Sequence, residues 1–226
     1  MDNIDCRLCK FKSTAASHLK SDELDTLGSN CAQVNFKTGD TIIKQDALSS
    51  NIIYIQTGFV KIHMDGPERE SILRISKAPT YLGIPTTMGD RINHYSATAL
   101  TDTKVCFIDT NAFRKFIYRN GRFAYEILLD RCKSDLDHFH RFVNLTQKHI
   151  NGRIADALLN FADNLFENDE IEMIINRSEF ADLVGSTRES VSRVLNQFHD
   201  EGLIINKDTK ILLKNRNSLE LISKNG

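Results

Sequence analysis

A long segment after residue 120 contains no proline and, beyond Gly121, no glycine, and its apolar residues recur at alternating steps of four and three. This spacing is that of the a and d positions of a coiled coil over about three heptads. We therefore expect a dimerisation helix over 121–147, through which two copies of the chain pair. The predicted seam consists of Tyr125, Leu129, Cys132, Leu136, Phe139, Val143 and Thr146.

A second apolar row on the same helix predicts packing against the chain's own N-terminal part while the seam meets the partner. The row consists of Phe123, Ile127, Leu128 and Phe142. An alternative remains open, in which this is one amphipathic helix that packs on its own domain without pairing.

The stretch 34–109 alternates short apolar runs with turn signals such as Gly39-Asp40 and Thr57-Gly58. Several short strands at this spacing favour a barrel or a sandwich. A short helix precedes them, with Ser21 as its predicted N-cap. The predicted domains are an effector-sensing β-barrel domain over 1–120, the helix over 121–147 and a C-terminal domain over 148–226.

Composition excludes several classes of protein. The 226 residues carry a net charge of −1, which does not by itself indicate a nucleic-acid partner. No apolar run approaches the roughly 18 residues that span a bilayer, so we expect a cytoplasmic protein without a membrane partner. The cysteine count of five is odd, which favours thiols or metal ligands over a disulfide framework. No Walker, nucleophile-elbow or His-Glu-x-x-His motif occurs, and we expect no enzymatic activity.

Two short helices joined by a glycine-containing turn are predicted in the C-terminal domain. Asn176 followed by Glu179 has the form of an N-cap with its capping-box partner, and Gly185 ends that helix. A new cap at Ser186 or Thr187 then starts a second helix that runs to about His199. One face of the second helix is apolar and must be buried, because its residues recur at helical spacing. These residues are Val191, Val194, Leu195 and Phe198.

Polar side chains occupy the opposite face near the start of the second helix. Arginine can donate two hydrogen bonds to guanine, and glutamate can accept one from cytosine, so this face suits base readout in a major groove. The predicted base-reading residues are Arg188, Glu189, Ser192 and Arg193. The alternative is a surface helix whose polar face is merely solvated. A formally acidic composition supports that alternative, with ten Lys or Arg against thirteen Asp or Glu from Lys148 onward.

The stretch 202–214 is typical of a two-stranded wing with a polar tip, and it follows the second helix directly. Basic groups there, together with hydroxyl and basic groups near the two helix starts, are predicted to contact DNA phosphates. The predicted phosphate contacts are Lys148, Arg177, Ser178, Thr187, Ser190, Lys207, Lys210 and Lys214.

The stretch 176–195 resembles the helix-turn-helix signature of the Crp/Fnr family of bacterial regulators, and 151–159 resembles the segment after the hinge of that family. The resemblance implies an α+β fold with a jelly-roll barrel like a cyclic-nucleotide-binding domain, a coiled-coil helix and a winged helix-turn-helix. It also implies a homodimer on palindromic double-stranded DNA, with half-sites close to TGTGA or TTGNGA, and RNA polymerase as a partner.

The sensing domain departs from the cAMP-binding pattern of the family. The family pattern has a Glu that contacts the ribose and an Arg that pairs with the cyclic phosphate, where this chain has Ile84 and Tyr95. Neither replacement can make those contacts, so we expect an effector other than cAMP, a small molecule or a gas. The candidate effector pocket is Gly83, Ile84, Tyr95, Ser96 and Ala97.

Two other sensing routes follow from the resemblance, and a third follows from the predicted coiled-coil seam. Cys6, Cys9 and Cys106 resemble ligands of the [4Fe-4S] cluster of Fnr-like sensors, although 14–16 lacks the third N-terminal cysteine, so Cys31 or an oxygen ligand would complete the set. Haem is the second route, and Cys132, facing its twin in a redox-sensitive disulfide, is the third. The candidate axial ligands of haem are His63, Met64, Met88, His94 and His149. In the alternative these are ordinary thiols and histidines.

The rival class of function is a ligand-binding regulatory or scaffolding protein whose helical tail contacts protein. The polar groups at the start of the second helix favour DNA instead. For the regulator we expect a population shift, in which a signal changes how the long helices pair and only a hinge around 146–152 moves.

Overall fold

The computed structural model describes residues 5–207 and 209–226, and it divides into two compact units, Met1–Asp135 and Leu136–Gly226. The boundary falls inside the helix α5 (Gly121–Gln147), so the predicted dimerisation helix contributes residues to both units. Two parts of the predicted domains, residues 1–4 of the sensing domain and Asp208 at the tip of the wing, lie outside the described residues.

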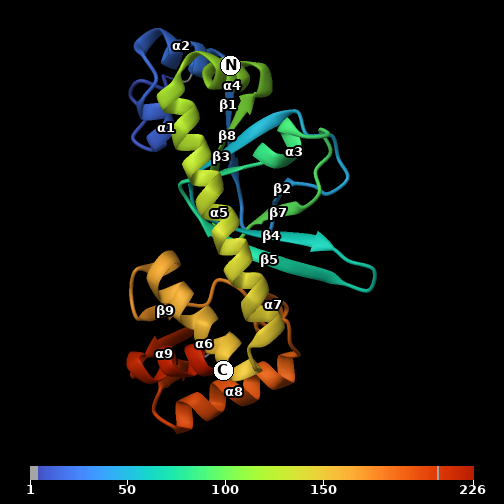
Figure 1. The fold of residues 1–226 in the computed structure, drawn as a ribbon, viewed down its shortest axis with the longest axis vertical. Helices are drawn as coiled ribbons and strands as arrows, with labels where there is room; N and C mark the ends of the chain where they lie inside the picture. Colours follow the sequence, from blue (N-terminus) through green and yellow to red (C-terminus); the bar gives the residue numbers. More distant parts are fainter. Residues whose placement is uncertain (1–4, 208) are drawn as a thin grey trace. The chain divides into compact units, whose positions relative to one another are not determined.

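The first unit contains two four-stranded antiparallel sheets, which confirms the predicted jelly-roll architecture (Figure 1). Each sheet has its own set of strands, so the arrangement is a sandwich and not a closed barrel. One sheet has the order β1 (Cys31–Phe36), β8 (Thr103–Asp109), β3 (Asn51–Thr57) and β6 (Thr80–Leu82). The other has the order β2 (Thr41–Ile43), β7 (Ser96–Ala99), β4 (Phe59–Asp65) and β5 (Glu70–Lys77).

Strand β3 is buried on both faces, which explains why its sequence is a continuous apolar run. Successive side chains of a strand point to opposite faces. Ile53 and Ile55 therefore enter the sandwich interior with residues of the second sheet, whereas Ile52 and Tyr54 join a second apolar cluster that contains helical residues. Both layers of core depend on this one strand.

Four short helices accompany the sheets of the first unit: α1 (Thr14–Ser17), α2 (Ser21–Ser29), α3 (Ile84–Met88) and α4 (Thr110–Arg119). The predicted N-cap of α2 is wrong by one residue. Lys20 is the cap, and its backbone N–H donates to Glu23 at 2.8 Å, so Ser21 is the first helical residue. The side chains of α2 and α4 pack with Phe123 and Ile127 of α5 on the sheet that contains β3.

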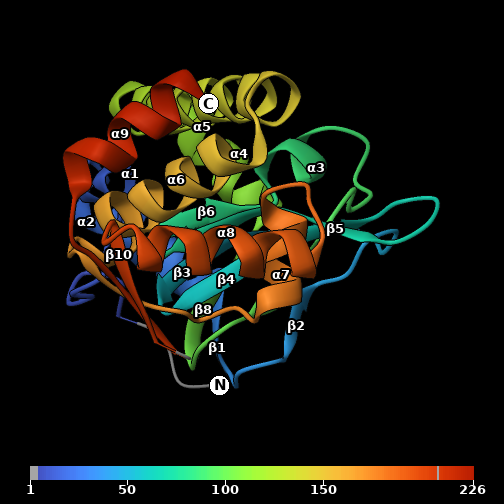
Figure 2. The ribbon, with the colours of Figure 1, turned by 90° about the horizontal axis from the view of Figure 1, so that it is seen from below.

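The second unit is helical with a small sheet of order β10-β11-β9. Its elements after α5 are α6 (Ile150–Asn160), the π-helix η1 (Phe161–Phe166), β9 (Glu170–Glu172), α7 (Arg177–Leu183), α8 (Arg188–Asp200), β10 (Ile204–Lys207), β11 (Lys210–Leu213) and α9 (Arg216–Asn225). Figure 2 shows α7 beside one end of α8 and β10 beside the other. Among the described residues, no helix has both the length and the apolar character needed to cross a membrane.

Candidate nucleic-acid interface

The start of α7 has the predicted capping box. The Asn176 side chain accepts hydrogen bonds from the N–H groups of Ser178 at 2.9 Å and Glu179 at 3.0 Å, and Glu179 accepts from the Asn176 N–H at 3.0 Å. These contacts satisfy backbone donors that have no partner inside the helix. The capping residues thus fix where α7 begins.

The turn between α7 and α8 needs glycine at its centre. Gly185 has φ +61°, and a Cβ there would lie 3.2 Å from Arg153 Nη1 and 3.3 Å from the Leu145 side chain. Arg153 donates to the Gly185 carbonyl at 3.0 Å, and Arg141 donates to the Leu183 carbonyl at 2.7 Å. Two arginines from α5 and α6 therefore hold the turn, a contact that periodicity in the sequence does not reveal.

Helix α8 has one buried and one exposed face, as predicted. The Thr187 hydroxyl accepts the Ser190 N–H at 3.2 Å and caps the helix. The apolar face is buried through Val191, Val194, Leu195 and Phe198. The predicted base-reading residues Arg188, Glu189 and Arg193 are exposed, and Ser192 is half-buried. The helix thus presents its polar N-terminal half outward on a fixed apolar base.

The predicted phosphate contacts divide into two groups. Lys207, Lys210 and Lys214 on the wing are exposed, as are Ser178 and Thr187, while Ser190 is half-buried. Lys210 contacts Glu170 of β9 at 2.5 Å, and this hydrogen bond raises the pKa of the lysine. The carboxylate of Glu170 therefore balances part of the lysine charge. The predicted contacts to phosphate stay predictions for this group.

Arg177 and Lys148 form the second group, because both are half-buried and have partners inside the unit. Arg177 donates to the side chain of Asn206 at 2.6 Å, which links α7 to the wing. The Lys148 ammonium lies 2.9 Å from Asp156 and 3.2 Å from the Ser223 hydroxyl, and its side chain is only 19% exposed. Sequence reasoning missed these partners, since none lies within one helical turn of its basic residue.

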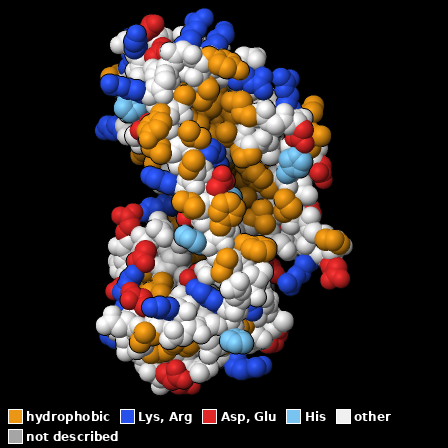
Figure 3. Space-filling view, in the orientation of Figure 1, with side chains coloured by type: hydrophobic (Ala, Val, Ile, Leu, Met, Phe, Trp, Pro, Cys, Tyr) orange, Lys and Arg blue, Asp and Glu red, His pale blue; other side chains and the backbone are white. Residues whose placement is uncertain are grey.

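Exposed apolar side chains follow α5 and include most of the predicted seam (Figure 3). Phe139 is 65% exposed, and Tyr125, Leu136, Val143 and Cys132 are also exposed, whereas Leu129 is half-buried. The second apolar row is only partly as expected. Phe123 and Ile127 are buried, but Leu128 and Phe142 are exposed because they flank the seam, so the apolar stripe is wider than the seam alone.

The candidate effector pocket already has its polar groups satisfied within the first unit. The Gly83 N–H donates to the Tyr95 hydroxyl at 2.8 Å, and Ser96 accepts the Gln45 N–H at 3.0 Å. Ile84 and Ala97 are buried in apolar clusters. The Tyr95 hydroxyl therefore already accepts the backbone N–H that precedes the short helix α3. An anionic ligand at this position would need that N–H as a hydrogen-bond donor.

The candidate haem ligands are scattered. Both ring nitrogens of His63 have partners, Glu70 at 2.7 Å and Thr98 at 2.9 Å, and His94 pairs with Asp90 at 2.7 Å. His149 is exposed at the start of α6, while Met64 and Met88 are half-buried in the first unit. In the described part of the chain, no hydrogen bond or ion pair joins any two of these side chains.

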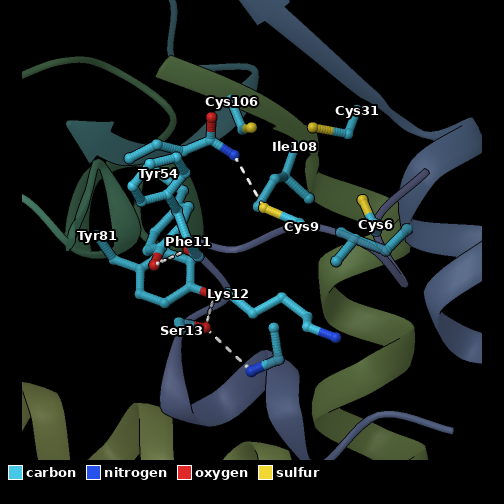
Figure 4. Close-up of a pocket in the computed structure, with 13 residues that line it drawn as sticks. Cys6, Cys9, Phe11, Lys12, Ser13, Cys31, Tyr54, Tyr81, Cys106 and Ile108 are labelled. Atoms are coloured by element: carbon cyan, nitrogen blue, oxygen red, sulfur yellow. Dashed lines mark hydrogen bonds between the residues drawn. The ribbon is translucent and has the colours of Figure 1, made fainter. Parts of the chain in front are cut away.

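The cysteines are arranged differently, because Cys6, Cys9, Cys31 and Cys106 line one pocket of the first unit (Figure 4). Cys132, in contrast, is exposed on α5. Within the described ranges, no three His, Cys, Asp or Glu residues are placed to hold a single metal ion.

Comparisons with known proteins match both halves of the chain. A cyclic nucleotide-binding domain model matches residues 33–120, and a Crp-like helix-turn-helix domain model matches residues 152–222. The cAMP-activated global transcriptional regulator CRP of Escherichia coli O157:H7 is 27% identical over 182 residues, which cover 78% of this chain and 86% of that protein. The nitrogen fixation regulation protein FixK of Bradyrhizobium diazoefficiens is 24% identical over 208 residues, covering 88% and 85% respectively.

Solved structures agree with this fold. The structure of FixK2 from Bradyrhizobium japonicum superposes with a TM-score of 0.76 at 20% sequence identity, covering 85% of this chain and 96% of that one. Identity this low establishes the fold alone. The two domain models and this superposition agree on the order of the two parts, a β sandwich followed by a helix-turn-helix.

Proposed function

The chain belongs to the Crp/Fnr family of DNA-binding transcription regulators, and from this premise we propose that it binds a palindromic operator as a homodimer. The signal that controls binding is sensed by the N-terminal domain. The family relatives are transcription regulators and not enzymes, and no catalytic step is part of the proposal.

The observation that carries the proposal is the exposure of Arg188, Glu189 and Arg193 on a helix whose other face is buried. Phosphate contacts position a protein on DNA, and contacts to base edges specify the sequence. A fixed helix that projects two arginines and a glutamate can enter a major groove and form such contacts. We propose half-sites close to TGTGA or TTGNGA, read by these residues and Ser192.

Pairing through the exposed apolar stripe of α5 is the second part of the proposal. A dimer places two recognition helices on one face of DNA, about 34 Å or one helical turn apart. The stripe is exposed in the single chain, and burying Phe139, Leu136 and Tyr125 against a second copy removes this apolar surface from water. RNA polymerase is the proposed further partner.

The proposed effector is not cAMP. Ile84 offers no acceptor for a ribose hydroxyl, and Tyr95 offers no charge for a phosphate while its hydroxyl already accepts the Gly83 N–H. A small molecule or a gas, sensed directly or through a cofactor, shifts the population of DNA-competent dimers. Haem is the weaker cofactor candidate, because His63 and His94 have other partners.

A mobility-shift titration on a 30-base-pair TGTGA palindrome and a TTGNGA palindrome tests the proposal. Arg193→Ala removes one base contact per half-site, which is worth about 1–3 kcal/mol of discrimination, so we expect operator affinity to fall at least about tenfold. Gln197→Ala is the matched control, because Gln197 is exposed on the same helix and its side chain donates a hydrogen bond to Glu201 at the end of that helix. We expect little change for the control.

Equal binding of wild type and Arg193→Ala to both palindromes and to unrelated DNA would contradict base readout by α8. Absence of any DNA binding, whichever palindrome is used, would favour the rival function, in which the helical tail contacts protein. In that case crosslinking of the full chain in a cell extract, with and without Arg188→Ala, identifies the protein partner.

A further inference from the structure

The long helix α5 is bonded directly to the turn between α7 and α8. Arg141, half-buried near the end of α5, donates to the Leu183 carbonyl at 2.7 Å. The Leu145 side chain lies so close to the turn that a Cβ at Gly185 would be 3.3 Å from it. All of these residues belong to the second unit, so the contact lies inside one compact unit. The turn that precedes α8 is thus attached to a helix from outside the helix-turn-helix.

The Arg141 guanidinium bonds a carbonyl at the end of a helix. Leu183 is the last residue of α7, and the last carbonyls of a helix have no N–H partner inside it. A cation is favourable at this end of a helix, and a charged donor makes a stronger hydrogen bond than a neutral one. Burial lowers the pKa of the Arg141 guanidinium, and the charge of Asp156 raises it in part. Arg141 therefore has a defined place inside the second unit and is not a solvated surface group.

A second link joins α5 to the helices α6 and α9. The Asn144 side chain donates to the Asp156 carboxylate at 2.8 Å, and the Ser223 hydroxyl of α9 donates to the same carboxylate at 3.0 Å. Asn144 precedes the predicted hinge around 146–152, and Asp156 follows it. The Asn144–Asp156 bond therefore spans the hinge, as does the Arg141 bond to α7. A rotation at the hinge must break both bonds.

The seam and the Arg141 contact lie on opposite faces of α5. Arg141 is two positions from Phe139 and from Val143, which is about 200° around the helix axis. Phe139 and Val143 are exposed residues of the proposed pairing surface, and both belong to the second unit. This part of α5 thus has one face for the partner copy and another that holds the turn before α8. In a dimer the position of α8 relative to the partner depends on this one helix.

We propose that Arg141 is a positioning residue for DNA reading, which fixes the separation of the two α8 helices in the dimer and so selects operators by the spacer between half-sites. Asn144 assists through its bond to Asp156. One base pair more or less in the spacer moves a half-site by about 3.4 Å and rotates it by about 35°. A recognition helix that is held firmly cannot follow this change without losing base contacts. The inference rests on the proposed function, because it requires a dimer and two half-sites.

The test is a mobility-shift titration of the full chain on palindromes whose spacer is varied by one and two base pairs. For wild type we expect one best spacer and an affinity at least about tenfold lower on either side of it, because a misplaced helix loses a base contact. Arg141→Met keeps a long side chain but removes its donors. It should reduce the preference to about twofold or less, because the freed hinge populates other arrangements. Arg141→Lys keeps a charged donor and should restore part of the preference.

Arg153→Met is the matched control, because Arg153 bonds the same turn from α6. It donates to the Gly185 carbonyl at 3.0 Å, but it follows the hinge, so its bond does not connect the turn to α5. Arg153→Met should change the affinity by a similar factor at every spacer and leave the preference as in wild type. On a duplex with a single half-site, Arg141→Met should bind like wild type, because the polar face of α8 is unchanged.

Three outcomes would overturn the role of Arg141. Wild type that binds every spacer equally has no fixed separation to explain. Arg141→Met that keeps the wild-type preference would show that the bond to Leu183 does not set it. An equal loss of affinity at every spacer and on the single half-site would indicate general damage to the domain.

Asn144→Ala covers the case in which Arg141→Met fails to fold, as judged by its circular dichroism. It removes the link to Asp156 and should lower the spacer preference at least about threefold, because a hydrogen bond to a charged acceptor is lost. An unchanged preference in that variant would overturn the proposal. Absence of binding by wild type to any palindrome would contradict the proposed function itself, whereas a preference kept by both variants would contradict the positioning role alone.

Discussion

The two units of the chain present their functional side chains in opposite ways. In the second unit, four candidate base-reading residues lie within six positions of one helix, and three of them are exposed. In the first unit, four cysteines from segments as far apart as residues 6 and 106 line one pocket that is partly open to solvent. A surface that reads a macromolecule is thus encoded locally, by a helix with one buried face, whereas a pocket depends on strand register and on the packing of distant segments.

The strongest test of this contrast is at Phe139, which is 65% exposed and therefore contributes little to the stability of the single chain. Phe139→Ser should leave the chain folded but weaken dimerisation at least about a hundredfold, because burial of a phenylalanine contributes about 1.5–3 kcal/mol on each side. Sedimentation equilibrium measures the dimer dissociation constant. Asp137→Ser, also exposed on α5 but outside the stripe, is the control and should change it little. An unchanged constant for Phe139→Ser would break the assignment of the stripe to pairing.

Phe180 is the opposite case, because it is fully buried and packs against Phe161 with ring centroids 5.9 Å apart. Phe180→Ala should lower the free energy of unfolding of the second unit by about 3–5 kcal/mol, through lost burial and a remaining cavity. Urea denaturation followed by circular dichroism measures this loss. Leu221→Ala, at a residue of α9 that is 59% exposed, is the matched control. Equal stability of the two variants would show that the core beneath the recognition helix is misplaced.

Tyr95 offers the smallest expected effect, since its hydroxyl accepts one hydrogen bond from the Gly83 N–H in the first unit. Tyr95→Phe should cost about 1 kcal/mol of stability, because one partly buried hydrogen bond is lost. Thermal unfolding measures the cost, and Tyr118→Phe, at a residue that is 85% exposed, serves as control. Isothermal titration of both variants and of wild type with cAMP should detect no binding. Tight cAMP binding by wild type would contradict the interpretation of the first unit.

The helix-turn-helix could be predicted from the sequence because its determinants are close together in the chain. The capping box of Asn176 and Glu179, the glycine of the turn and the spacing of Val191 to Phe198 each act within one or two helical turns. The heptad spacing of α5 likewise indicated its exposed stripe. Local periodicity did not reveal that Leu128 and Phe142 are exposed, since which flank of the seam is covered depends on tertiary packing.

The pocket could be predicted only in part. The family resemblance suggested Cys6, Cys9 and Cys106 as ligands, but Cys31 entered only as one of two alternatives for the remaining ligand. Its place beside Cys106 depends on the register between β1 and β8, which are separated by 66 residues of chain from Phe36 to Thr103. The hydrogen bond between the side chains of Gln33 and Gln56 depends on the same register and on that of β3 with β8, and neither residue carries a recognisable motif.

Strand β3 connects the pocket lined by the four cysteines with the interior between the two sheets. Tyr54 lines the thiol pocket, while its neighbours Ile53 and Ile55 fill the interior between the two sheets. Because protein interiors are close-packed, a displacement of the strand backbone at Tyr54 also displaces the residues that this strand places between the sheets. A ligand that shifted β3 from the side of the pocket would therefore change the packing of Ile53 and Ile55 against the second sheet.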